Sequence, residues 1–178
     1  MKCLYYLFAT CLKLVRIDVN HFNTSKVEGS IAGAFYQCRS AEEIHIEDWD
    51  VSNCTSAYRL FHECWKLKTM DFSKWNTSNF TNCRNLFTNC WAINNINLSN
   101  CDFSKVVDFG WAFYACKALT TIITDGLKLP NIDMSDIYLH QSPLSVDTIV
   151  GLLNALPVTT NNYSFNIGTT NINKLTDE

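Results

Sequence analysis

Apolar and polar positions alternate along this chain in a frame that repeats about every 26 residues. Counted from a recurring Phe-x-x-Cys pair, apolar residues come three, six and eight positions after the cysteine. A shared apolar frame with a period of roughly 20 to 50 residues is typical of solenoids, in which each unit buries its core against its neighbours. The copies of the pair begin at Phe8, Phe35, Phe61, Phe87 and Phe113.

The stretch from five to nine residues after each cysteine alternates with the period of a β-strand, as in residues 69–73. Met70 and Phe72 are expected to point inward, and the strands of successive units to stack into a parallel sheet. The outward positions then form three rows across the sheet. These rows are Arg16, Glu43, Thr69, Asn95 and Thr121; Asp18, His45, Asp71, Asn97 and Ile123; and Asn20, Glu47, Ser73, Ser99 and Asp125.

A turn motif with Asp or Asn two positions before Ser follows each strand, because such side chains hydrogen-bond to nearby backbone groups. The copies begin at Asn23, Asp50, Asn76 and Asp102. The next segment, such as residues 80–87, has apolar residues at helical spacing and predicts a helix of one or two turns. The pattern therefore predicts an α/β solenoid with a parallel β-sheet on one face and short helices on the other, about 26 residues per repeat.

The repeat fades near residue 130, which divides the chain into two regions. Residues 1–132 hold about five repeats, of which we expect the first to be incomplete. Residues 133–178 are expected to form a helix-plus-strand capping unit that is itself truncated. Its helix is predicted at residues 142–157, with Ser145 as N-cap and Pro157 as the stop. Its strand is predicted from the alternation of Tyr163, Phe165 and Ile167, followed by a turn at Gly168.

Composition and cysteine spacing limit the partners and bound groups that the chain is expected to have. The 178-residue chain has a net charge of −3 and no basic run, so nothing in it favours nucleic acid. Five of its nine cysteines are the repeat cysteines, and we expect these to pack as small buried apolar residues rather than to form disulfides or bind metal. No zinc-type Cys or Cys/His spacing occurs, and we predict no cofactor.

The first fifteen residues could pass for a short secretory signal, with one lysine before an apolar stretch. Phe8, Cys11, Leu14 and Ile17 nevertheless fall on the repeat frame, so these residues are predicted to belong to the first unit. We expect no export signal in the chain, no membrane-spanning run and no membrane insertion.

Two stretches carry a resemblance to a known family: FHECWKLKTMDFSKWNTSNFTNC from Phe61 and FYQCRSAEEIHIEDWDVSNCTS from Phe35. They resemble the repeat of the BspA-like leucine-rich repeat surface proteins of bacteria, phages and some protists, over about residues 4–132. The resemblance implies a leucine-rich-repeat solenoid that is extracellular, on a cell surface or on a virion. It further implies non-catalytic binding to a protein or glycan on a cell surface, and it supplies no catalytic residues.

Two groups of side chains are candidates for such binding. The first lies on the outward rows of the strands, where acidic residues favour a basic partner; the alternative is a merely solvated sheet face. It comprises Asp18, His45, Asp71, Asn97, Glu43 and Glu47. The second is Trp65 and Trp91, which directly follow the cysteine in adjacent repeats and could anchor a partner. The alternative is that both rings lie flat on the edge of the core.

An enzyme is not predicted. The four histidines, His21, His45, His62 and His140, occupy unrelated repeat positions without a nucleophile and carboxylate beside them. Asp48 could attract Ca²⁺ with its acidic neighbours, but the turn motif already explains Asp50, and no metal site is predicted. The predicted function is therefore a binding module of an adhesin or phage host-recognition type. The alternative is a structural spacer or intersubunit scaffold without a ligand, and the oligomeric state stays open.

Overall fold

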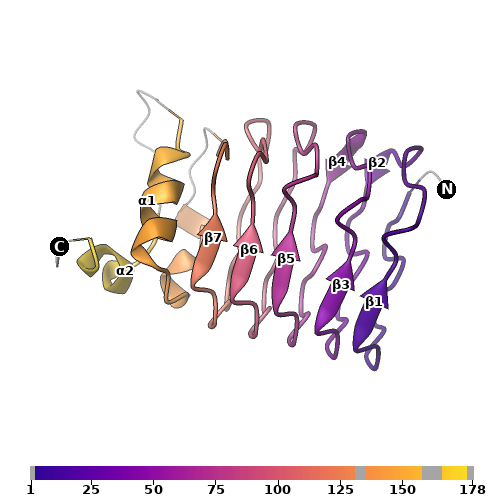
Figure 1. The fold of residues 1–178 in the computed structure, drawn as a ribbon, viewed down its shortest axis with the longest axis horizontal. Coiled ribbons are helices and arrows are strands. Elements are labelled where there is room, and N and C mark those ends of the chain that lie inside the picture. Colours follow the sequence, from indigo (N-terminus) through magenta and orange to yellow (C-terminus); the bar gives the residue numbers. More distant parts are fainter. Residues whose placement is uncertain (1–2, 131–134, 158–165, 176–178) are drawn as a thin grey trace.

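The computed structural model describes residues 3–130, 135–157 and 166–175, and these form an α/β arrangement of small parallel strands with few helices (Figure 1). The strands are β1 (Arg16–Asp18), β2 (Gly29–Ser30), β3 (Glu43–His45), β4 (Cys54–Ser56), β5 (Thr69–Asp71), β6 (Asn95–Asn97) and β7 (Thr121–Ile123). The helices are the 3-10 turns η1 (Ser135–Ile137) and η2 (Leu139–Gln141), and the α-helices α1 (Val146–Asn154) and α2 (Thr169–Asn173).

Five of the strands lie side by side in one row, in the order β1, β3, β5, β6, β7 (Figure 1). β1 pairs with β3, and β5 pairs with β6 and β6 with β7, all in parallel. Arg16 faces Glu43, and Asn95 faces both Thr69 and Thr121, which confirms the predicted rows within each pair. Within the described residues no strand ladder joins β3 to β5, so the row divides into two small sheets; just before these strands, Lys68 N donates to Glu42 O at 3.3 Å.

β5 and β6 are shorter than predicted because the side chain of the last residue in each strand accepts a hydrogen bond from a backbone N–H two residues later. Oδ1 of Asp71 accepts a hydrogen bond from Ser73 N at 2.8 Å, and Oδ1 of Asn97 accepts one from Ser99 N at 3.0 Å. Such local bonds compete with a continued ladder. The predicted Asp/Asn-x-Ser turns that follow are confirmed; in one of them Oδ1 of Asp50 accepts from Ser52 N at 3.0 Å and from Ser52 Oγ at 2.6 Å.

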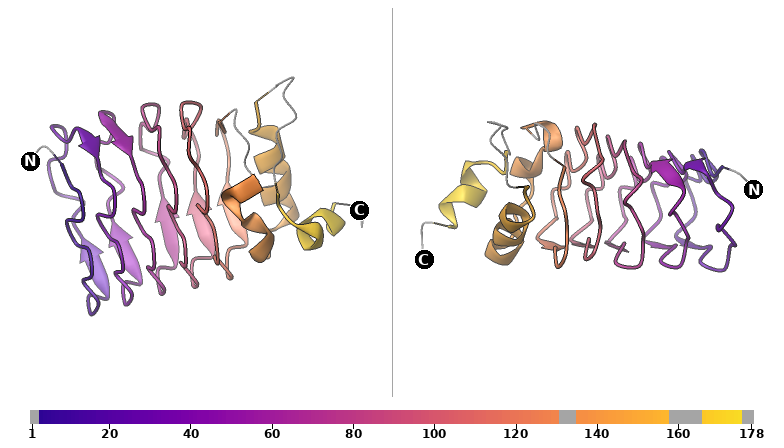
Figure 2. Two further views of the ribbon diagram at one scale, coloured as in Figure 1. Left: turned by 180° about the vertical axis from the view of Figure 1, so that it is seen from behind. Right: turned by 90° about the horizontal axis from the view of Figure 1, so that it is seen from above.

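The prediction of short helices on the opposite face is wrong. β2 and β4 pair in parallel there, on the side away from β1 and β3 (Figure 2). Residues 80–87 form no helix: Asn82 makes isolated parallel bridges to Ser56 and Asp108, and turns begin at residue 84. Phe61 O accepts from Cys64 N at 3.1 Å, and Glu63, the third residue of this turn, has φ 61°. A positive φ at that position alone marks a type II turn. In a helix, Phe61 N and Glu63 N would donate to carbonyls four residues earlier in the chain. Here they donate to Leu86 O and Thr88 O of the next unit, at 3.0 and 2.8 Å.

The recurring phenylalanines form one column through the core. Phe35 and Phe61 stack with ring centroids 5.7 Å apart and planes 3° apart, and Phe61 and Phe87 with centroids 5.2 Å apart. Phe8 and Phe113 extend the column at its two ends, at 5.6 and 5.9 Å. Like residue therefore stacks on like residue at the predicted period, and each ring is covered mainly by its own copies.

The repeat cysteines line the same core as free thiols. All nine cysteines are unpaired, and seven of them are buried. Burial raises the pKa of Cys38 to about 12 and that of Cys54 to about 11. The thiols therefore stay protonated near neutral pH, as expected of small buried apolar groups.

The end of the chain packs against the last strand. Ser145 caps α1, its Oγ accepting from Thr148 N at 3.2 Å, and Thr148 Oγ1 accepts from Ile122 N of β7 at 2.9 Å. These bonds confirm the predicted N-cap and the presence of a helix after it, but α1 is shorter than the predicted residues 142–157 and ends at Asn154, before Pro157. Of the predicted strand, Tyr163 and Phe165 lie outside the described residues, while Ile167 is buried and belongs to no strand. No helix in the described part of the chain has the length and apolar character to cross a membrane.

Candidate ligand-binding surface

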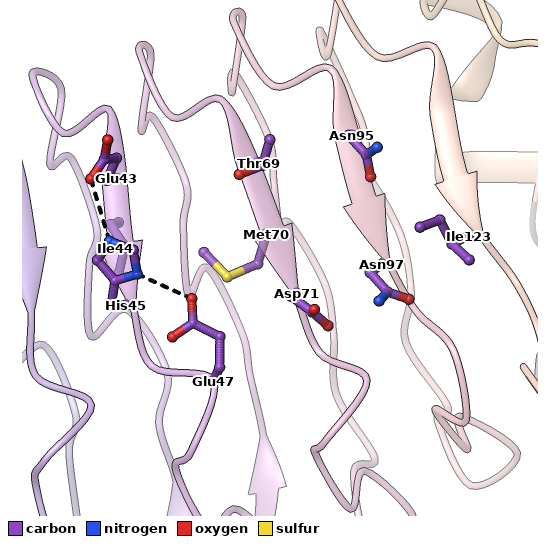
Figure 3. Close-up of a pocket in the computed structure, with 10 residues that line it drawn as sticks. All are labelled: Glu43, Ile44, His45, Glu47, Thr69, Met70, Asp71, Asn95, Asn97 and Ile123. Atoms are coloured by element: carbon purple, nitrogen blue, oxygen red, sulfur yellow. Dashed lines mark hydrogen bonds and ion pairs between the residues drawn. The ribbon is translucent and has the colours of Figure 1, made fainter.

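A groove of about 320 Å³ lies on the strand row, around the place where β3 and β5 are not paired (Figure 3). Seven of its ten lining residues are polar, and Ile44, Met70 and Ile123 supply an apolar part. The lining comes from β3, from Glu47 just beyond it, and from β5, β6 and β7, so the groove runs across both small sheets. The complete lining is Glu43, Ile44, His45, Glu47, Thr69, Met70, Asp71, Asn95, Asn97 and Ile123.

His45 lies between two glutamates at one side of the groove (Figure 3). Its Nε2 is 3.3 Å from Glu43 Oε2, and its Nδ1 is 3.2 Å from Glu47 Oε1. Glu43 Oε2 also lies 3.2 Å from Nη1 of Arg16 on the neighbouring strand. The His45 side chain is about one-third exposed, so a ligand in the groove could reach the ring and both carboxylates.

The groove carries an excess of negative charge. Glu43, Glu47 and Asp71 are carboxylates, whereas its lining contains no lysine or arginine. Oδ1 of Asp71 is held by Ser73 N, and Oδ1 of Asn97 by Ser99 N, so their second polar atoms are the ones left to face a ligand. Such a surface suits an ammonium, a guanidinium or a cluster of hydroxyl donors.

Asp18 belongs to the predicted set but does not line the groove. It lies on β1, where its Oδ2 is 3.2 Å from Arg16 Nη2. The hydrogen bond from Arg16 is the main cause that lowers the pKa of Asp18. The structure thus brings together five of the six strand-face candidates, namely Glu43, His45, Glu47, Asp71 and Asn97, and leaves Asp18 on the neighbouring strand.

Trp65 and Trp91 form a separate surface feature and do not line the groove. Their rings stack with centroids 4.7 Å apart and planes 11° apart. Trp91 is 44% exposed and Trp65 is half-buried. The guanidinium carbon of Arg39 lies 4.3 Å from the centroid of the Trp65 ring, and Arg39 Nη2 is 2.6 Å from Glu63. The result is a three-layer stack, with Arg39 on one side of Trp65 and Trp91 on the other.

Sequence reasoning missed several members of these two features. Arg39 occupies the same repeat position as Trp65 and Trp91, so alignment on the cysteines already placed the three side by side. Thr69 and Asn95 belong to a predicted outward row but were not selected as ligand-binding residues. The missing signal was the break between β3 and β5, which the repeat does not mark, because Glu43 to Thr69 and Thr69 to Asn95 have the same spacing of 26 residues.

The remaining polar clusters lie outside the groove. His62 packs on Tyr36 with ring centroids 5.4 Å apart, and its Nε2 is 3.4 Å from Glu63 Oε1. Burial is the main cause that lowers the pKa of His62. Across the described residues, no three His, Cys, Asp or Glu side chains gather in a way that could hold a metal ion.

Comparison with known proteins gives one family match. The model of the family described as "Mycoplasma protein of unknown function, DUF285" matches residues 2–125. This range includes the seven strands of the described residues, the groove and the stacked tryptophans. No curated protein and no solved structure matches the chain.

Proposed function

The chain belongs to the DUF285 family, which is related to the BspA-like repeat proteins, and from that premise we propose that it is a non-catalytic binding module. Its residues 1–132 would be BspA-like leucine-rich repeats coiled into a solenoid, and residues 133–178 a capping unit. The equal registers of the strand pairs and the phenylalanine column support this architecture. Extracellular display, on a cell or a virion, belongs to the same proposal.

The acidic groove between β3 and β5 is the observation that carries the proposal. It brings Glu43, Glu47 and Asp71 to one surface that lacks a lysine or arginine of its own. Glu43 is already paired with Arg16 Nη1 at 3.2 Å, as Asp48 Oδ1 is with Lys74 Nζ at 2.6 Å, whereas within the described residues neither Glu47 nor Asp71 forms an ion pair with a lysine or arginine. We propose that a basic segment of a surface protein, or an amino-bearing glycan, supplies the cation that the groove lacks.

The stacked tryptophans would add contact area to the interface with the same partner. Aromatic side chains dominate the binding energy of many interfaces, and a rigid pair loses little conformational freedom on binding. Arg39 and Trp91 hold the Trp65 ring from both sides, so the pair is already ordered without a ligand.

The test is a binding measurement with the purified chain, using a glycan array, immobilised polylysine and intact cells as probes. The variant Glu47→Gln with Asp71→Asn removes two charges and keeps the shape of both side chains. It should weaken binding several-fold, mainly through slower association, and should reduce the salt dependence of binding, as neutralising exposed interface charges does. The control is Glu28→Gln, which makes the same chemical change at an exposed position away from the groove.

Equal binding by the groove variant and the control would contradict the proposed site. The alternative function is a structural spacer or intersubunit scaffold that has no ligand, and the ion pairs between neighbouring units are compatible with it. Trp65→Ala with Trp91→Ala tests the tryptophans. If the variant loses binding to cells with an unchanged circular dichroism spectrum, the tryptophans take part in recognition; a folded parent chain that binds none of the probes would favour the spacer.

A further inference from the structure

The stack of Arg39, Trp65 and Trp91 ends in an open ring face. Arg39 covers one face of Trp65, with its guanidinium carbon 4.3 Å from the ring centroid, and Trp91 covers the other face, with the ring centroids 4.7 Å apart. Among the described residues no cation or aromatic ring lies over the outer face of Trp91, and this residue is 44% exposed. The stack therefore has room for one more flat layer on Trp91.

Lys117 is the residue that the repeat places beside Trp91. Thr120 N donates to Asn94 O at 3.1 Å, three residues after each of the two, so their units lie side by side here. These units hold β7 and β6; β6 lies between β5 and β7, and α1 packs on β7, so both units are covered on each side by other described elements. Lys117 is exposed, and within the described part of the chain its ammonium group forms no ion pair.

A second lysine adds positive charge to the stack. Lys66 directly follows Trp65, is exposed, and likewise forms no ion pair with any described residue. The neighbouring carboxylate of Glu63 is already paired with Arg39 Nη2 at 2.6 Å, so it does not neutralise either lysine. The tryptophan stack is therefore locally positive, whereas the groove on the strand row is acidic.

We infer that the outer face of Trp91 binds a pyranose ring that carries a carboxylate. One face of such a ring presents C–H groups, whose slight positive charge suits the negative face of an aromatic ring. The carboxylate at the edge of the sugar pairs with the ammonium group of Lys117, and Lys66 adds to the positive potential around it.

This inference rests on the proposed binding function and deepens it, because it selects between the two classes of partner. A basic protein segment that filled the acidic groove and extended to the tryptophans would meet the like charges of Lys66 and Lys117 there. A glycan in which amino sugars alternate with acidic sugars carries both signs of charge. It supplies a cation to the groove and a carboxylate to the tryptophan stack.

Isothermal titration calorimetry with two sugar trimers as probes tests the inference. The trimer of galacturonic acid and the galactose trimer of the same linkage share their ring stereochemistry, and the acidic one has a carboxylate in place of the C6 alcohol. The acidic trimer should bind the parent chain several-fold more tightly than the neutral trimer at low salt. At about 0.5 M NaCl this preference should largely disappear, because salt screens exposed charges.

Three variants separate ring stacking from charge. Trp91→Leu introduces the residue that the repeat has at Leu12, and it should weaken binding of the acidic trimer by about tenfold or more. Lys117→Gln keeps the ring face, so it should remove most of the preference for the acidic trimer and leave the neutral trimer unaffected. The control Lys26→Gln makes the same chemical change at an exposed lysine away from the stack and should change neither affinity. Circular dichroism checks that each variant is folded.

Equal affinity for the two trimers, or acidic-trimer binding that Trp91→Leu leaves unchanged, would overturn the inference. So would a single-stranded thymidine oligonucleotide that binds the stack more tightly than the acidic trimer, since the site would then suit nucleic acid. If the acidic trimer does not bind while polylysine binds through Glu47 and Asp71, this inference fails and the proposed groove stands. A parent chain that binds neither these trimers nor the probes of the groove would overturn both.

Discussion

The thiol of Cys64 donates a hydrogen bond to the backbone carbonyl of Phe35, in the preceding unit, at 3.1 Å. The same carbonyl accepts from Cys38 N, also at 3.1 Å, and thereby closes the turn of its own unit. Cys90 and Cys116 repeat the thiol bond to Phe61 and Phe87, at 3.1 and 3.2 Å. The Phe-x-x-Cys pair thus connects each unit to the next as well as forming its turn, which explains why both residues recur together.

Cys90→Ala should therefore destabilise the fold more than its small change in volume suggests. The variant removes a buried sulfur and one of the two donors to Phe61 O, for an expected loss of about 1 to 2 kcal/mol in the free energy of unfolding. Urea denaturation followed by circular dichroism measures this loss. The control is Cys3→Ala, at an exposed cysteine, and equal effects of the two substitutions would contradict the role given to the buried thiol.

Because of the buried thiols, we expect the free energy of unfolding to fall at alkaline pH. The pKa of Cys38 is raised from 9.0 to about 12 by burial, so above pH 9 the unfolded chain releases a proton that the folded chain retains. The unfolded state then binds fewer protons, and the free energy of unfolding falls as pH rises from about 9 towards 12. Each such thiol contributes at most about 1.4 kcal/mol per pH unit.

Urea denaturation at pH 8 and pH 10 measures this alkaline slope. Cys38→Ala should reduce the slope, because it removes one of the thiols that ionise only on unfolding. An identical slope in the parent chain and the variant would show that other groups cause the effect.

The Asp50 turn can be tested with a substitution that the chain itself provides. Oδ1 of Asp50 accepts two hydrogen bonds from Ser52, and Asn23 and Asn76 make the same bonds in their own units. Asp50→Ala should cost about 1 kcal/mol in the free energy of unfolding, as removal of a capping acceptor does. Asp50→Asn keeps the acceptor and should stay within about 0.5 kcal/mol of the parent.

The same pair of variants gives a prediction in acid. Hydrogen bonds from Ser52 lower the pKa of Asp50 below 3.8 in the folded chain. Its ionised form therefore stabilises the fold above pH 3.8, and this contribution is lost as pH falls through the lowered pKa. Asp50→Asn should show a smaller loss between pH 5 and pH 2.5 than the parent chain, as measured by thermal unfolding. Parallel curves would show that the carboxylate contributes nothing.

Phe61 tests the aromatic column. Its ring is fully buried between Phe35 and Phe87, so Phe61→Ala should cost about 3 to 5 kcal/mol in the free energy of unfolding. Val107→Ala is the control, because Val107 is 73% exposed and should change stability by less than about 0.5 kcal/mol. A cost below 1 kcal/mol for Phe61→Ala in chemical denaturation would show that the column is not a main part of the core.

The sequence by itself determined which residues of successive units pack against each other. The period places Phe61 on Phe35 and Asn95 beside Thr69, because equivalent residues of successive units meet wherever like stacks on like. The Asp50 turn and the Ser145 N-cap were equally predictable, since each depends on side chains within three residues of the backbone groups that they bind.

Only the tertiary structure decided how the face opposite the strand row is built and where the row divides. Apolar residues three and four positions apart satisfy a short helix and a series of type II turns equally well, as in residues 80–87. The turns prevail because Phe61 N and Glu63 N find acceptors in the next unit, which no local pattern contains. The division of the row between β3 and β5 likewise depends on backbone groups of two different units, and the groove across it has a shape that the sequence could not reveal.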